Sequence, residues 1–139
     1  MKSWLGYLVG AVALAPGVGA YAQSAPVSYL STASTNATLV QAGRTFVKVI
    51  LPINTTTTVY YLKLYDKATA PTCGTDTPKW RIPIPFGASN SGGGISLPND
   101  GLQFQLGFGF CLVGGIADND SSNAATGVTL NFGISQFTR

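Results

Sequence analysis

The chain has 139 residues, a length that suits one domain with a sizeable core. Only 9% of the residues are charged, and the net charge of +3 has no basic run behind it, which argues against a nucleic-acid interface. Both Glu and His are absent. Because His is the usual proton carrier near neutral pH, the composition predicts a protein that is not an enzyme.

The first 22 residues differ from the rest of the chain. Lys2 precedes an apolar run over residues 4–14, and the segment ends in Ala20-Tyr21-Ala22. These are the three parts of a secretory signal peptide, with cleavage predicted after Ala22. The alternative is an N-terminal arm that stays on the chain and packs against a neighbouring subunit. The run is too short and too interrupted by Gly and Pro for a stable membrane span of about 20 residues.

The next elements are predicted from composition and period. Residues 23–36 are rich in Ser, Thr and Ala and are expected to form a flexible lead. Runs of β-branched and aromatic residues with period-2 alternation then predict short strands. Their ranges are 37–41, 44–51, 60–65, 80–85, 95–97, 102–106, 108–113 and 128–135. The segment 37–139 is therefore predicted to be one all-β domain, an antiparallel β-sandwich or jelly roll of about eight strands.

The alternation also predicts which side chains share a face. In the second strand, Val47, Val49 and Leu51 are expected on one face, and Phe46, Lys48 and Ile50 on the other. In the third strand, Tyr60, Leu62 and Leu64 are expected opposite Tyr61, Lys63 and Tyr65. The strongest turn signal is Pro98-Asn99-Asp100-Gly101, because Pro presets φ and Gly accepts a positive φ.

Two cysteines are present, Cys73 in a polar loop and Cys111 in an apolar strand. In an exported protein an even count suggests a disulfide, which would tie the loop to the core. The alternative is one loop thiol and one buried thiol, unpaired. The spacing fits no metal site and no His is present to complete one, so neither a metal nor another cofactor is expected.

The acidic residues suggest structure rather than catalysis. They are Asp66, Asp76, Asp100, Asp118 and Asp120. Four of the five stand in turn contexts, where Asp commonly accepts hydrogen bonds from backbone amides. Asp118-Asn119-Asp120 resembles part of a calcium loop, but the Gly and the terminal Glu of that pattern are missing, so a solvated turn is expected.

Several phrases of this sequence, YLKLYDKATAPT before GTDTP, then IPIP, SLPNDGLQF and ADND, resemble one protein family. It comprises small virion structural proteins of tailed bacteriophages and prophages. The resemblance covers about residues 32–134 and is most specific over residues 60–85. It implies a structural protein of the particle, and a capsid decoration or cement protein that stabilises capsomer joints is the expected role. The implied partners are the major capsid protein or other virion proteins, and decoration proteins on symmetry axes are expected to be dimers or trimers.

Within this hypothesis, residues 1–36 would lie as an arm along a neighbour. The candidate interface residues are Trp4, Leu5, Tyr7 and Leu8 in the arm, and Tyr61, Tyr65 and Trp80 in the domain. The three domain aromatics could instead form a sugar-binding platform or part of the core. The alternative function is a secreted or periplasmic module that recognises a glycan or protein surface after the leader is cleaved.

Overall fold

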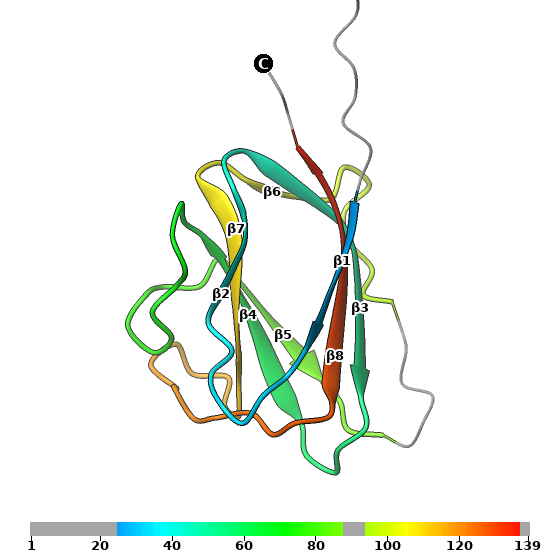
Figure 1. Cartoon of the computed structure of the whole chain (residues 1–139), viewed down its shortest axis with the longest axis vertical. Helices are drawn as coiled ribbons and strands as arrows, with labels where there is room; N and C mark the ends of the chain where they lie inside the picture. The colour runs from blue at the N-terminus through cyan, green and yellow to red at the C-terminus, as the bar shows by residue number, and fades with distance from the viewer. Residues whose placement is uncertain (1–24, 88–93, 137–139) are drawn as a thin grey trace, which may run out of the picture.

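The computed structural model describes residues 25–87 and 94–136, which form eight strands (Figure 1). The leader or arm predicted over residues 1–22, with Trp4, Leu5, Tyr7 and Leu8, lies outside the described residues. The strands are β1 (Ala25–Leu30), β2 (Thr38–Ala42), β3 (Thr45–Asn54), β4 (Tyr60–Asp66), β5 (Trp80–Ile84), β6 (Leu102–Phe104), β7 (Gly107–Val113) and β8 (Val128–Gln136).

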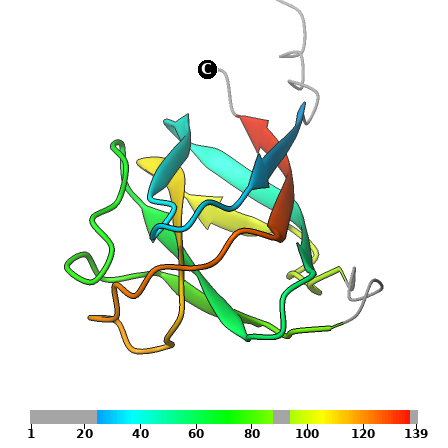
Figure 2. The ribbon, with the colours of Figure 1, turned by 60° about the horizontal axis from the view of Figure 1, so that its bottom comes forward.

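The strands form two four-stranded antiparallel sheets. Sheet A has the order β1-β8-β3-β6 and sheet B the order β2-β7-β4-β5. Four strand pairs are those of one long hairpin folded over on itself, which is the jelly-roll arrangement. They are β1 with β8, β2 with β7, β3 with β6 and β4 with β5. Figure 2 shows the two sheets as separate layers. The predicted all-β sandwich is confirmed.

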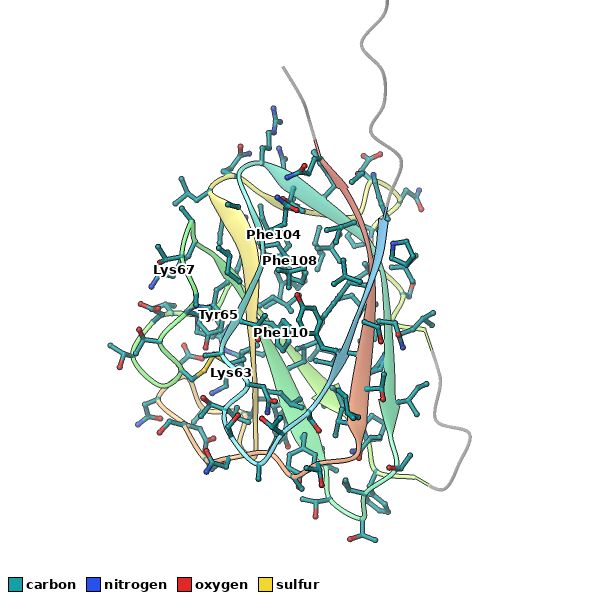
Figure 3. All side chains as sticks on the ribbon, in the orientation of Figure 1. Lys63, Tyr65, Lys67, Phe104, Phe108 and Phe110 are labelled. Carbon is teal, nitrogen blue, oxygen red and sulfur yellow. A yellow bond between two sulfur atoms is a disulfide. The ribbon has the colours of Figure 1, made fainter. Side chains whose placement is uncertain are left out.

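Aromatic rings fill the space between the sheets. Phe108 lies 5.0 Å from Phe104 and 5.1 Å from Phe132, measured between ring centroids. Tyr29 meets Phe110 edge to face at 5.2 Å. Figure 3 shows the labelled phenylalanines pointing between the two layers. Such tilted and edge-on pairs add about 0.5–1.5 kcal/mol each beyond the burial of their area.

The first strand corrects the prediction of a flexible lead over residues 23–36. Residues 25–30 pair with β8 along their whole length, and Val27 and Tyr29 pack against the core. The small and polar residues around them resemble a linker, but partly buried Val27 and Tyr29 alternate with exposed Pro26, Ser28 and Leu30, as in a half-buried strand.

Two other predicted strands are altered. Residues 95–97 form no strand, although the Ile95 amide donates a hydrogen bond to the carbonyl of Ile50 at 3.0 Å. The strand predicted over 102–106 ends at Phe104 because the Asp66 carboxylate accepts hydrogen bonds from the next two amides. The turn before it is confirmed, since Gly101 has φ +77° and donates to the Pro98 carbonyl at 2.7 Å.

A β-bulge overturns the predicted facing of β3. The register against β8 shifts between Val47 and Val49, so Lys48 is an extra residue in β3. Val47 and Val49, which simple alternation places on one face, therefore lie on opposite faces of the sheet. Val47 and Ile50 are therefore both buried in the core, whereas Val49 and Leu51 face outward. No helix in the two described ranges is long and apolar enough to cross a membrane.

Candidate functional site

The outer face of sheet B is fastened by a disulfide. Cys73, in the β4–β5 loop, is bonded to Cys111 of β7, with a Cα–Cα distance of 6.0 Å. Cys111 is fully buried and packs in a small cluster with Tyr65 and Val113 on this side of the sheet. The predicted bridge is thus present, and it holds the β4–β5 loop over the outer face of the sheet.

A buried cation fastens a second loop to the same face. Lys63 of β4 is fully buried, and its ammonium donates to the carbonyl oxygens of Ala117 at 2.5 Å and Asp120 at 3.0 Å. Burial lowers the pKa of Lys63, and the nearby carboxylates of Asp120 and Asp118 oppose that change. Carbonyls of the loop that resembles a calcium site therefore face a lysine.

The carboxylate of Asp120 is engaged by its own turn. It accepts hydrogen bonds from the amides of Gly115 and Ser122, both at 3.1 Å, and from the Ser122 hydroxyl at 2.7 Å. The expectation that this residue stabilises a turn is confirmed. Asp118, beside it, forms an ion pair with Arg81 of β5. Backbone and side chains together make the β7–β8 loop a cap on sheet B.

The capped face corrects one predicted interface residue. Tyr65 is fully buried, and none of the described residues makes a hydrogen bond with its hydroxyl. Burial raises its pKa to about 12. Tyr61 is half-buried against the same cluster, and the side chain of Trp80 is exposed at the start of β5. The three aromatics therefore do not form one open platform. Tyr61 and Tyr65 share one cluster beneath the loops, whereas Trp80 pairs with Leu64, a core residue, and so lies on the other side of the sheet.

The remaining carboxylates connect loops to strands. Asp66 accepts from the amides of Gln105 at 3.0 Å and Leu106 at 2.7 Å and from the Lys79 ammonium at 3.2 Å. Burial raises the pKa of Asp66, but these hydrogen bonds lower it by more, so that the net shift is downward. Asp76 accepts from the Lys67 ammonium, which lowers its pKa, and from an amide of its own loop.

Among the described residues, the part of the outer face of sheet A formed by β1, β8 and the second half of β3 has no charged side chain, whereas Arg44 and Lys48 lie over the Phe46 ring at the β6 end of that face. The registers of β1 and β3 against β8 place nine of its residues in three rows of three. We call this grid the neutral face; its rows are Pro26–Gly133–Val49, Ser28–Asn131–Leu51 and Leu30–Thr129–Ile53.

The β3 column of the neutral face is apolar and accessible. Val49 is 43% exposed, and Leu51 and Ile53 are each 39% exposed. At the far edge, Leu30 is 71% exposed. Isolated apolar side chains are normal on a surface, but a row of them on a flat sheet is typical of a contact surface. The sequence did not predict this face, because it depends on the bulge at Lys48 and on the strand order.

One cavity of about 310 Å³ lies where the edges of β1 and β2 diverge. Phe110, Leu112 and Leu130 contribute apolar lining, and no lining residue is charged. The rim is the loop after β1, whose polar groups bind one another: the Asn36 side chain, for example, accepts from the Thr32 amide and donates to the Ser34 carbonyl, both at 2.8 Å. The cavity therefore offers few free polar groups to a ligand.

Comparisons of the chain with protein-family models, with curated proteins and with solved structures find no match.

Proposed function

We propose that the protein is a non-enzymatic structural component of a tailed-phage particle. Its role is that of a capsid decoration or cement protein, which binds across capsomer joints through the neutral face. The resemblance over residues 60–85 supports this role. The jelly roll supports it as an architecture that viral capsid proteins use repeatedly, although the fold also serves lectins and other proteins.

The single observation that carries the proposal is the apolar column of Val49, Leu51 and Ile53, whose row neighbours on β8 and β1 are uncharged. Burying such a face removes apolar area from water and leaves no ion unpaired. The cores of protein interfaces are likewise depleted of charged residues. On the opposite side of the sandwich, Lys63, Arg81 and their acidic partners are used to attach loops to sheet B.

A binding experiment tests the proposal. Particles from a strain that lacks the gene are mixed with the purified protein and sedimented. We expect the protein to pellet with the particles, and Leu51→Lys, which places a charge in the centre of the neutral face, to reduce binding at least about tenfold. Ala68→Lys, in an exposed loop on the sheet B side, is the matched control and should bind normally. Equal binding by Leu51→Lys would refute the role of the neutral face.

A secreted or periplasmic binding module is the second candidate. The disulfide between Cys73 and Cys111 favours it, because such bonds persist in oxidising compartments. The signal-like segment before Gln23 points the same way. In this case the protein would be recovered from the periplasm or the medium with Gln23 as its first residue.

A further inference from the structure

The outer edge of β1 is the least guarded of the four sheet edges. Unpaired strand edges are protected by short length, proline, charge or bulges. The edge strand β5 contains Arg81 and Pro83, β6 has only three residues, and β2 has a bulge between Leu39 and Gln41. By contrast, β1 has six residues, none of them charged, and a proline only at its start.

The hydrogen bonds of β1 show which backbone groups face outward. The amide of Ser31 donates to the Val128 carbonyl at 2.8 Å. Along an antiparallel strand, the amide and carbonyl of every second residue point to the same side. The backbone amides and carbonyls of Val27 and Tyr29 therefore also point toward β8. Ser28 and Leu30 then direct their amides and carbonyls away from the sheet. Pro26, which has no amide hydrogen to donate, is on the same outward set.

We propose that β1 pairs antiparallel with β1 of a second copy of the chain, across a two-fold axis at Tyr29. In this register Ser28 of each copy lies opposite Leu30 of the other, and both are outward-facing residues. The pairing forms about four backbone hydrogen bonds and needs no donor from Pro26. In this register the two pairs beside the axis are complete, because Ser28 and Leu30 each have an outward amide and an outward carbonyl. Centring the axis one residue to either side instead places Leu30 opposite Pro26, or Ser28 opposite Thr32. Each of these pairs lacks one donor, because Pro26 has no amide hydrogen and the Thr32 amide already donates to the Asn36 side chain at 2.8 Å.

The neutral faces of the two copies then become one continuous surface. The row through Ser28 continues into the row through Leu30 of the second copy, so each exposed leucine gains a neighbour across the axis. Neither face brings a charge to the join. The joined sheet would present two apolar β3 columns to a partner. The use of this surface on a particle rests on the proposed function, whereas the pairing itself does not.

The mass of the full chain in solution tests the pairing. We expect light scattering after size exclusion to give twice the chain mass at about 100 μM and a falling mass on dilution. Ser28→Pro removes an outward amide without touching the bonds to β8, and it should give a monomer. Ser28→Ala keeps the amide and should remain a dimer. Circular dichroism of each variant establishes that the fold is retained.

Hydrogen exchange of the unmodified protein provides a second test that does not depend on a variant. The amides of Ser28 and Leu30 should become more protected as the concentration rises, while those of Val27 and Tyr29 stay protected throughout. A monomer at every concentration, a dimer that folded Ser28→Pro retains, or concentration-independent exchange at Ser28 would overturn the pairing. A monomer that still pellets with particles would refute the pairing alone, and a dimer that does not pellet would refute the proposed function alone.

Discussion

The ammonium nitrogen of Lys63 lies 3.0 Å from the backbone carbonyl oxygen of Asp120, 57 residues along the chain. This contact and the Cys73–Cys111 bond close the outer face of sheet B beneath two loops. On the outer side of sheet A, no loop of residues 25–87 or 94–136 is attached across the neutral face by a comparable bond. Sheet B therefore carries the attachments of two loops, whereas sheet A exposes the apolar column of Val49, Leu51 and Ile53.

Replacing Lys63 should loosen the β7–β8 loop. In Lys63→Met the carbonyls of Ala117 and Asp120 lose their donor, and we expect the free energy of unfolding to fall by about 2–3 kcal/mol. Urea denaturation measures the loss. Lys48→Met is the control, because Lys48 is exposed and makes one carbonyl contact at the surface, and it should cost less than about 1 kcal/mol. Equal losses in the two variants would contradict the structural role of Lys63.

Removing the hydroxyl of Tyr65 should stabilise the protein. The hydroxyl is buried and no residue in the described part of the chain makes a hydrogen bond with it. Tyr65→Phe removes this buried, unpaired polar group and should raise the free energy of unfolding by about 1 kcal/mol. Tyr60→Phe, at the other end of β4, is the comparison and should change little. Thermal unfolding of both variants decides the matter; a clear destabilisation of Tyr65→Phe would show that the hydroxyl has a partner in solution.

Acid should weaken the fold through Asp66. Its pKa in the folded protein is lowered from 3.8, since the amides of Gln105 and Leu106 and the Lys79 ammonium outweigh the effect of burial. Below about pH 4 the unfolded chain therefore binds more protons than the folded one, and the free energy of unfolding falls as the pH drops.

The matched variants for this pH dependence are Asp66→Asn and Asp100→Asn. Asp66→Asn should be less stable at pH 7 by about 1–2 kcal/mol, yet lose less stability than the unmodified protein between pH 5 and pH 2. The side chain of Asp100 accepts no hydrogen bond from a described residue, so Asp100→Asn is the control for the loss at pH 7 and should cost less than about 0.5 kcal/mol there. Identical pH slopes for Asp66→Asn and the unmodified protein would count against this assignment.

Loss of the disulfide should destabilise the domain while preserving its sheets. The bond closes a loop with a sequence separation of 38, for which the loss of unfolded-state entropy corresponds to about 4 kcal/mol. The double variant Cys73→Ala/Cys111→Ala should unfold at a lower urea concentration and show faster amide exchange in the β4–β5 loop. An unchanged unfolding midpoint would contradict the fastening role of the bond.

Local sequence pattern predicted those parts of the fold that depend on neighbours in the chain. The alternation along β4 and β8 and the turn at Pro98–Gly101 are present. The Cys73–Cys111 bond is present too, but its prediction came from the even number of cysteines and not from local pattern. The prediction of which β3 side chains share a face is wrong, because one extra residue, Lys48, reverses the alternation. Nothing in the composition of the strand indicates this bulge.

The candidate site was less predictable than the fold. Tyr65 alternates with core residues along β4, so its pattern predicts an exposed position on the outer face of the sheet. Loops that are distant in sequence bury it instead. The neutral face brings together residues from β1, β3 and β8, and only the strand order makes them neighbours. Which face of a sandwich is capped is a tertiary property that strand periodicity does not encode.

The intact mass of the protein recovered from its natural source tests the virion assignment most directly. We predict that the chain co-purifies with phage particles in a fixed ratio to the major capsid protein and begins at Met1. Recovery only from the periplasm or the medium, with a chain that begins at Gln23, would contradict the assignment and establish the secreted module instead.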